Sequence, residues 1–357
     1  MRVRHLHLTA LTALVAVAAC QDATTTTAPP VAPASNGTPI DASRNAIEYA
    51  VMGDVPYGPA AVEWFPGLIE DINRAPKVRR VVHVGDTKNG STTCDDAWFE
   101  YIYDSFQSFQ DPVIYTPGDN EWTDCHRDNN DNWDPLERLD AIRDLYFANP
   151  GQTLGGRSKA VLAQDGFPEN TLWMESNVVF AAIHIVGSNN NLEAWTCFRP
   201  FDSACPDGTS PETPAMTADR LAEYAARDAA NRAWLHRAFD MADDRGAAGV
   251  VIFAHGDMWH PRDVAAGVDF SGHQQFVDEF AARSAAFGDP VLLFAGDSHN
   301  YRVDQPLVGD TNYGAQDAPN VTQITVDRSI EDDVNWVRLR IDPRSDEVFS
   351  WEEVTVN

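Results

Sequence analysis

The chain has 357 residues, of which 43% are hydrophobic and 10% aromatic, so it can bury a substantial core and disorder is not its default state. Its formal net charge is −28 at pH 7. This acidity argues against binding of a nucleic-acid duplex, which requires a basic face toward the phosphates. We interpret most of the acidity as a solvated surface and a smaller part as carboxylates that hold cations.

The first 19 residues have the features of a signal peptide. A basic start at Arg2 and Arg4 precedes a stretch of apolar and small residues that is too short for a membrane-spanning helix. Cys20 follows directly and resembles the lipidated first residue of a mature bacterial lipoprotein; ordinary cleavage, with Cys20 incidental, is the alternative. We expect an exported protein, anchored to a bacterial membrane through Cys20 and facing the periplasm or the cell exterior.

Residues 20–45 are rich in Thr, Ala and Pro, a composition that predicts an extended tether rather than a packed structure. The folded domain is predicted to span residues 46–357. An even number of cysteines remains after Cys20, and an oxidising compartment favours disulfides. Three pairings are possible, of which we favour Cys94 with Cys125 and Cys197 with Cys205. The sequence has no CxxC spacing, which disfavours a zinc site built from these four cysteines.

Apolar strands alternate with helical patterns in the first part of the folded region. The strands end at Asp54, Asp86 and Asp119, and the helices are expected at 65–74, 95–106 and 135–147. This alternation predicts βαβ units and a largely parallel sheet.

The pattern then changes to a hairpin, 171–175 with 178–187, which turns at Ser176-Asn177. After it we expect a polar insertion, helices and strands in the following order: insertion 188–214, a long helix at 215–243 that is broken at most once, a strand ending at His255, a helix at 274–286, a strand ending at His299, and strands at 321–326, 334–341 and 347–356. Two packed α/β sheets with helices outside, one end of them more antiparallel, fit this order.

Several of these strands end in the same way, with a glycine followed by an aspartate. The repeated pairs are Gly53-Asp54, Gly85-Asp86, Gly118-Asp119, Gly256-Asp257 and Gly296-Asp297. Each pair alone is typical of a turn or a helix cap. Because ligands bind beyond the carboxyl ends of strands in open α/β sheets, we interpret the repetition as one metal cluster in which Asp86 bridges two ions.

The order of the motifs resembles calcineurin-like metallophosphoesterases over residues 47–305. The resemblance is carried by Asp54, Gly85-Asp86, Gly118-Asp-Asn-Glu121, Ala254-His255-Gly256 and Gly296-Asp-Ser-His299. It implies an α/β/β/α sandwich of two mixed sheets flanked by helices. It also implies a binuclear metal site and hydrolysis of phosphate mono- or diesters, small molecules or nucleotides, by a metal-bound hydroxide.

The same resemblance assigns roles to individual residues. Asp54 and His299 would hold the first ion, Asp86 both ions, and Asp119, His255 and Asp297 the second; Asn120, Asp86 and His255 would be the catalytic residues. Carboxylates together with imidazoles suit Mn, Fe or Zn, and the excess of oxygen ligands also allows Mg or Ca.

Three positions depart from the family. Pro56 stands where a second histidine ligand is usual, Asn120 stands where the family has a histidine after its asparagine, and Asp297 replaces the first histidine of Gly-His-x-His. The first ion therefore lacks a ligand, which Asn89, Tyr57 or water can supply. With more carboxylate and less imidazole, we expect a shift away from zinc.

Other polar residues near these motifs have ordinary interpretations. His83 and His184 lie inside strands and are expected in the core, with a role in the site as the alternative for His184. His126, His260, Lys88 and Arg127 are expected at the surface; in the alternative, His126 or His260 replaces the acid missing at Asn120, and Lys88 or Arg127 contacts a phosphate oxygen. Two other functions stay open: a catalytically impaired metal-binding surface module, and a serine esterase that uses Ser298 of Gly296-Asp-Ser298. The second needs a base and an acid next to the serine.

Overall fold

The computed structural model describes residues 39–356 apart from residue 42 and residues 196–211. The predicted signal peptide, Cys20, most of the predicted tether and the Cys197–Cys205 pair lie outside the described residues. None of the described helices combines the length and the apolar character needed to cross a membrane.

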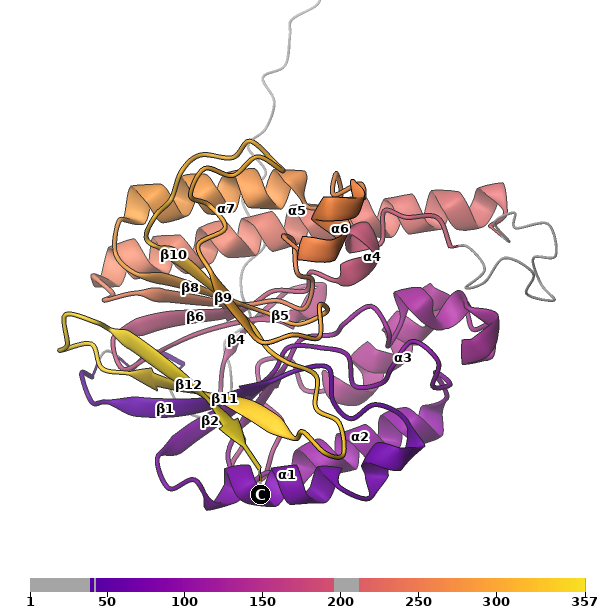
Figure 1. The fold of residues 1–357 in the computed structure, drawn as a ribbon, viewed down its shortest axis with the longest axis horizontal. Coiled ribbons are helices and arrows are strands. Elements are labelled where there is room, and N and C mark those ends of the chain that lie inside the picture. Colours follow the sequence, from indigo (N-terminus) through magenta and orange to yellow (C-terminus); the bar gives the residue numbers. More distant parts are fainter. Residues whose placement is uncertain (1–38, 42, 196–211, 357) are drawn as a thin grey trace, which may run out of the picture.

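Two mixed sheets lie face to face (Figure 1). The first has five strands in the order β12 (Phe349–Thr355), β11 (Asn335–Ile341), β1 (Ile47–Met52), β2 (Val78–His83) and β3 (Val113–Tyr115). The second has seven, in the order β4 (Leu162–Gln164), β5 (Phe167–Glu175), β6 (Val178–Ala182), β7 (Val250–Phe253), β8 (Val291–Ala295), β10 (Val321–Thr325) and β9 (Arg302–Asp304).

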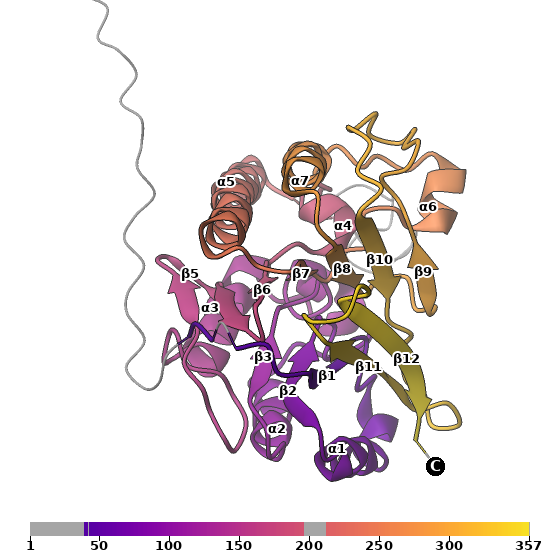
Figure 2. The same cartoon turned by 90° about the vertical axis from the view of Figure 1, so that its left-hand side faces the viewer.

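Helices cover the outer face of each sheet, as the two perpendicular views show (Figures 1 and 2). On the first sheet lie α1 (Phe65–Arg74), α2 (Asp96–Gln107) and α3 (Pro135–Tyr146), and on the second lie α5 (Pro214–Arg245) and α7 (Gln274–Phe287). The short helices α4 (Gly187–Asn190) and α6 (Pro261–Ala266) lie in loops, as do the 3-10 turns η1 (Pro59–Val62), η2 (Thr123–His126) and η3 (Asp128–Asn130). The predicted α/β/β/α sandwich is therefore confirmed.

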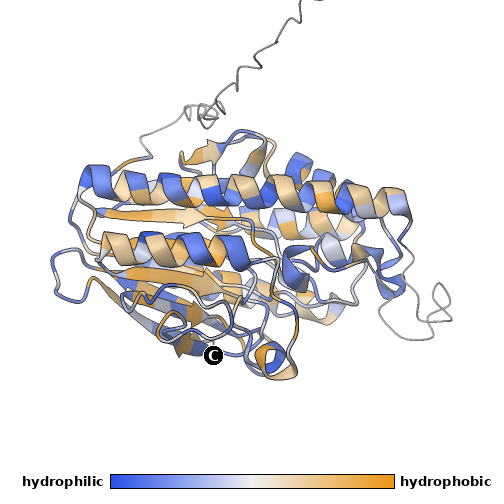
Figure 3. Cartoon of the chain, turned by 90° about the horizontal axis from the view of Figure 1, so that it is seen from above, coloured by the Kyte–Doolittle hydropathy of each residue, from blue (hydrophilic) through white to orange (hydrophobic). Residues whose placement is uncertain are grey.

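Three apolar layers hold the sandwich together, one between the sheets and one under each set of helices. Successive side chains of a strand point to opposite faces of the sheet, so strand β7 contributes to two of these layers. Val250 and Ile252 belong to the layer under α5 and α7, while Val251 and Phe253 belong to the layer between the sheets. In the view from above, α5 and α7 carry alternating hydrophilic and hydrophobic stretches over strongly hydrophobic strands (Figure 3).

Local sequence signals set the ends of the helices. The Asp134 carboxylate accepts hydrogen bonds from Leu136 N and Glu137 N at the start of α3, and Pro135 occupies the first turn. A side-chain N-cap of this kind stabilises a helix by about 1 kcal/mol. Gly246 adopts the left-handed conformation directly after α5, the longest of the described helices, at its C-terminal end.

The predicted helices agree closely with the structure, and α1 has the predicted bounds. The hairpin is also confirmed: β5 and β6 pair antiparallel, and Ser176 and Asn177 have φ values of 53° and 56°, as a two-residue hairpin turn requires. Helix α5 is one continuous element, so the allowed break does not occur. Strands β4 and β9 and helix α6 were not predicted, because none of them exceeds six residues.

The strands that were predicted to alternate with helices pair in parallel, and antiparallel strands lie beside them, as expected of two mixed sheets. Parallel pairing is confined to β1–β2–β3 in the first sheet and to β6–β7–β8–β10 in the second. Antiparallel strands flank both groups. In the first sheet these are β11 and β12, which return from the end of the described chain to pair beside β1.

The predicted disulfide between Cys94 and Cys125 is confirmed, with its Cα atoms 5.8 Å apart. Both residues are fully buried. The bond joins the loop that follows β2 to the loop that follows β3 across a separation of 31 residues.

We expect loss of this disulfide to lower the free energy of unfolding by about 3–4 kcal/mol, because closing a loop of this length restricts the unfolded chain. Denaturant unfolding of Cys94→Ala, Cys125→Ala and the double variant measures the effect. Because either single substitution removes the whole bond, the losses should not add. Additive losses, or none, would show that the bond does not stabilise the fold.

Candidate metal centre

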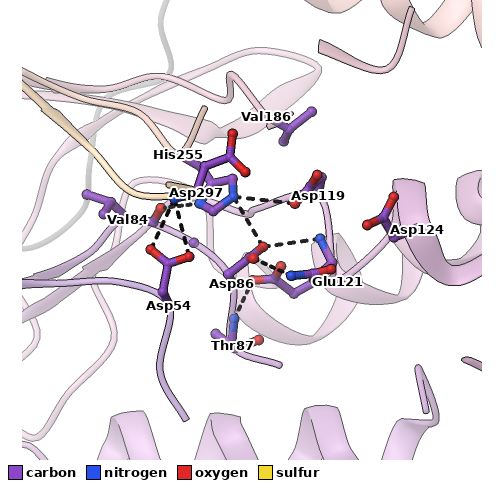
Figure 4. Close-up of polar contacts among 12 residues, drawn as sticks. Asp54, Val84, Asp86, Thr87, Asp119, Glu121, Asp124, Val186, His255 and Asp297 are labelled. Carbon is purple, nitrogen blue, oxygen red and sulfur yellow. Dashed lines mark hydrogen bonds and ion pairs between the residues drawn. The ribbon is translucent and has the colours of Figure 1, made fainter. Parts of the chain in front are cut away.

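The predicted ligand residues converge at one edge of the sandwich (Figure 4). Asp54, Asp86 and Asp119 follow β1, β2 and β3 of the first sheet; His255 and Asp297 follow β7 and β8 of the second. Parallel pairing brings together the carboxyl ends of β1, β2 and β3 in the first sheet and of β7 and β8 in the second, and Figure 4 shows the side chains of both groups next to one another. The side chains of Asp54, Asp86, Asp119 and His255 are buried there.

Backbone conformation turns several of these side chains inward. Asp54, Asp86, Asp297 and His299 have φ values of 54°, 57°, 67° and 60°. Left-handed conformations are uncommon outside glycine, although Asp, Asn and His tolerate them best. Local strain of this kind is characteristic of functional sites.

Glycines let the carboxylates approach closely. A Cβ on Gly118 would lie 2.2 Å from Asp86 Oδ1, and one on Gly296 would lie 2.5 Å from Asp54 Oδ2. A Cβ on Gly187 would lie 2.6 Å from Asp119 Oδ2 and 2.9 Å from both carboxylate oxygens of Asp297. A side chain at any of these glycines would therefore fill the space between the acidic groups.

The first potential ligand group consists of Asp54, Asp86 and His299, each of which offers one atom within 4.8 Å of the others. His299 Nε2 lies 3.2 Å from Asp54 Oδ1. The Tyr57 hydroxyl lies among the three, 2.8 Å from Asp54 Oδ1, 3.0 Å from Asp86 Oδ2 and 2.8 Å from His299 Nε2. Of the two side chains suggested for the incomplete first site, the structure brings in Tyr57. Asn89 instead accepts hydrogen bonds from Ser91 and Thr92 in its own loop.

The second group consists of Asp86, Asp119 and His255. His255 Nδ1–H donates to the Val84 carbonyl at 2.9 Å, which fixes the ring and directs Nε2 toward Asp86 Oδ1 at 3.2 Å and Asp119 Oδ1 at 3.4 Å. Within the described residues this buried Nε2 atom has no hydrogen-bond partner. A carbonyl behind the imidazole and an open nitrogen in front are typical of a histidine that ligates a metal.

Asp86 belongs to both groups, and Asn120 holds it in place. The Asn120 backbone N–H donates to Asp86 Oδ1 at 3.1 Å, and its side-chain amide donates to Asp86 Oδ2. The amide is thus occupied by the Asp86 carboxylate in this structure.

Asp297 lies beside the two groups without belonging to either. Its backbone N–H donates to both Asp54 carboxylate oxygens, at 3.2 and 3.1 Å. In Figure 4 its carboxylate projects on the far side of His255 from Asp86.

The electrostatic field at this edge is strongly negative. Burial and the neighbouring carboxylates, among them Asp119, raise the pKa of Asp86 and of Asp297 well above the usual range, against the opposing effect of His255. Burial alone would lower the pKa of His255, yet the charges of Asp86 and the other carboxylates raise it well above its ordinary value. Burial would raise the pKa of Asp119, but the nearby His255 imidazole outweighs burial and lowers the pKa of that carboxyl. Such a field attracts cations.

The residues present therefore fit metal ions. Three separate features of such a site are present: the buried His255 Nε2 atom that forms no hydrogen bond with a described residue, the carboxylates gathered around it, and the glycine-lined space between them. The donor set of carboxylate oxygens, imidazole nitrogens and one phenol suits Mn, Fe, Zn or Mg.

Several neighbouring residues differ from their predicted surroundings. Lys88 is fully buried rather than exposed; its ammonium donates to the Asn120 carbonyl at 2.8 Å, and burial lowers its pKa to about 8. His260 is also buried, at 6% exposure. Arg127 pairs with Asp124, and His126 is partly buried, with Nδ1 2.6 Å from the Thr123 carbonyl oxygen.

His83 and His184 are core residues, as predicted. His83 Nε2–H donates to the Val55 carbonyl at 2.6 Å, and His184 Nδ1 lies 3.0 Å from Glu169 Oε1. Burial lowers the pKa of both imidazoles to about 4.

The turn that follows Gly187 was not predicted: Gly187 is the expected end of a strand, and the residues after it belong to the expected polar insertion. The four residues Ser188–Asn191 all have left-handed φ values, between 51° and 64°. Ser188 Oγ donates to Asp119 Oδ2 at 2.9 Å, and the buried Arg227 guanidinium donates to the Asn190 carbonyl at 2.9 Å. The detectable signal was the run of three asparagines after a glycine, since asparagine tolerates this conformation.

Ser298 lacks the surroundings of a catalytic serine. Its hydroxyl oxygen accepts a long contact of 3.5 Å from Arg302, and no histidine or carboxylate among the described residues hydrogen-bonds to it. Nothing in its contacts supports the esterase hypothesis.

Comparison with known proteins finds no matching family model and no matching curated protein. Several solved structures are similar at low identity, among them the following two. One is GAP50, the anchor in the inner membrane complex of Plasmodium, with 11% identity, a TM-score of 0.40, and coverage of 87% of this chain and 89% of that one. The other is purple acid phosphatase PPD1 from yellow lupin (Lupinus luteus) seeds, with 9% identity and a TM-score of 0.44; the match covers 88% of this chain and 54% of the lupin chain.

Proposed function

We propose that this protein is a metal-dependent phosphoesterase that hydrolyses phosphate mono- or diesters at a binuclear centre. The observation that carries the proposal is the sharing of Asp86 between two adjacent ligand groups, Asp54–Asp86–His299 and Asp86–Asp119–His255. Two ions that share a carboxylate lie close enough to act on one phosphoryl group. The resemblance of the strand-end motifs to calcineurin-like metallophosphoesterases supports the same reaction.

The two groups would each hold one ion. Asp54, His299 and Tyr57 would complete the first site, Asp119 and His255 the second, and Asp297 lies next to both. When bound, divalent or trivalent ions such as Mn, Fe, Zn or Mg supply Lewis acidity toward a phosphate oxygen and lower the pKa of water.

The protein's own residues orient these groups. Val84 fixes the tautomer and direction of His255 through its carbonyl, and Ser188 holds Asp119 through a hydrogen bond. Asn120 fixes Asp86 from both its backbone and its side chain. An amide cannot donate a proton to a departing alkoxide, so position 120 provides binding and orientation but no general acid.

A second candidate function is a metal-binding surface module with impaired catalysis. The specific observation in its favour is the Tyr57 hydroxyl, which occupies the space among Asp54, Asp86 and His299. If this phenol excludes the first ion instead of binding it, the protein would hold a single ion.

Substitution of the shared carboxylate tests the proposed function. We expect the wild type, stripped with a chelator and reloaded separately with Mn, Fe, Zn or Mg, to bind two ions per chain and to hydrolyse aryl phosphates with at least one of these metals. Asp86→Asn should lose about 100-fold or more in metal affinity and turnover, because both ligand groups lose a ligand. Elemental analysis and p-nitrophenyl phosphate or bis-p-nitrophenyl phosphate assays give the readouts.

A matched control removes the same charge at the other end of the strands of the first sheet, where β1 begins. Asp346 is exposed in the turn between β11 and β12, and Asp346→Asn should behave as the wild type. Thermal melts show whether each variant is folded. A saturating metal, at about 100 times its dissociation constant, should stabilise the wild type by about 2.7 kcal/mol but not Asp86→Asn. Full metal content and turnover in Asp86→Asn would refute the shared-carboxylate centre.

Tyr57→Phe separates the two candidate functions. If the phenol is a ligand, the variant should fall from two ions per chain to one and lose about 10- to 100-fold in turnover, as expected when one group around a metal is removed. If the phenol excludes the ion, metal content should rise from one ion to two. Elemental analysis decides between these results, and circular dichroism checks the fold.

The leaving group provides a further test. Because position 120 holds no proton donor, we expect kcat/KM to fall steeply as the pKa of the leaving alcohol rises, by about 10²–10⁴-fold between p-nitrophenyl and alkyl phosphates. A series of substituted phenyl phosphates measures this slope. A flat dependence would show that another residue protonates the leaving group.

A further inference from the structure

A hollow of about 520 Å³ opens beside His299, one of the residues of the first ligand group. This volume lies within the range of small-molecule binding sites, roughly 300–1,000 Å³. Its lining residues come from three loops: His260, Pro261 and Arg262 after β7, Ser298, His299, Asn300, Tyr301 and Arg302 after β8, and Arg328 after β10.

The topology explains why the hollow adjoins the candidate metal centre. Strands β7, β8 and β10 are parallel neighbours, so the loops that follow them leave the same edge of the second sheet. Figure 2 shows α6, which contains Arg262, next to β9 at this edge. His299 belongs to both the hollow and the candidate metal centre, because it lines the hollow and its Nε2 atom lies 3.2 Å from Asp54 Oδ1.

The charge of the hollow contrasts with that of the chain. The protein has 26 Lys and Arg residues against 54 Asp and Glu, yet three of the nine lining residues are arginines. Arg302 is engaged by Asp257, with which it forms hydrogen bonds of 3.1 and 2.9 Å. Its role is to hold the loop after β8.

Arg262 and Arg328 are differently placed. The Arg328 guanidinium forms no hydrogen bond or ion pair with any described residue, and the side chain is exposed. Arg262 is 79% exposed, and its guanidinium makes only long contacts, 3.5 Å from His260 Nε2 and 4.0 Å from Asp263 Oδ1. Both guanidinium groups therefore retain donors for a ligand in the hollow.

We propose that this hollow binds a second phosphate group of the substrate, so that the protein acts on phosphoesters that carry two separate phosphates. The inference rests on the proposed function, which places the reacting phosphate at the metal centre. Guanidinium groups match phosphate in charge and in bidentate geometry, and the strongly acidic surface elsewhere would repel such a ligand. The arginine-lined hollow is where the second phosphate finds an opposite charge.

The test uses ligands that cannot be hydrolysed and that differ by one anionic group. Calorimetry of the metal-loaded protein compares propane-1,3-diphosphonate and hexane-1,6-diphosphonate with propylphosphonate. We expect at least one diphosphonate to bind on the order of tenfold more tightly than propylphosphonate, the effect of one added charge-assisted contact. The Arg262→Ala/Arg328→Ala double variant should lose this preference.

Arg237→Ala is the matched control, because Arg237 is exposed on α5, outside the lining of the hollow, and forms no ion pair within the described residues. It should keep the preference. The inference is overturned if the wild type shows no preference or if the double variant retains it. It is also overturned if the affinity of the double variant falls equally for the diphosphonates and for propylphosphonate, since the arginines would then bind the reacting phosphate.

Turnover of p-nitrophenyl phosphate by the same preparations distinguishes this inference from the proposed function. Turnover without a diphosphonate preference leaves the phosphoesterase standing and removes the second phosphate site. An arginine-dependent preference without turnover under any metal supports recognition of two phosphates and rejects hydrolysis.

Discussion

The concentration of carboxylates at one edge of the sandwich is the constraint on which the site depends. Asp54, Asp86 and Asp119 are buried within hydrogen-bond reach of shared partners, and Asp297 stands beside them. Buried like charges cost several kcal/mol unless protons or cations compensate for them. The fold maintains this arrangement with glycines, left-handed backbone and hydrogen bonds to Asn120 and Ser188. So much local structure around repelling groups fits the cation site that we propose.

Much of the fold could be predicted because the strands are short apolar runs that end in glycine. The order of helices and strands followed from their periodicity, and the bounds of α1 were recovered. Antiparallel edges were harder to predict. Strands β4 and β9 have three residues each, too few for a pattern, and the place of β11 beside β1 is a long-range pairing that no local signal encodes.

The candidate site, like the fold, could be predicted only in part. The strand-end aspartates and two histidines could be named from the sequence, since parallel strands place their carboxyl ends together. The sequence left Asn89, Tyr57 and water as possible ligands of the first ion. It could not decide among them, because the path of the chain after Pro56 determines where the Tyr57 hydroxyl lies. The burial of Lys88 and the bond from Ser188 to Asp119 depend on loops that pack against each other from distant parts of the chain.

The return of β11 and β12 to the first sheet has a consequence for the maturation of the protein. Strand β1, which delivers Asp54, pairs on one side with β11, whose residues lie almost 300 positions later in the chain. A nascent polypeptide that has emerged only as far as β10 already contains all the candidate ligands, yet it cannot complete the sheet that supports the first of them. Under the proposed function, capture of the first cation is therefore expected to follow synthesis of β11, so a product truncated before β11 would accumulate as a species with incomplete metal loading.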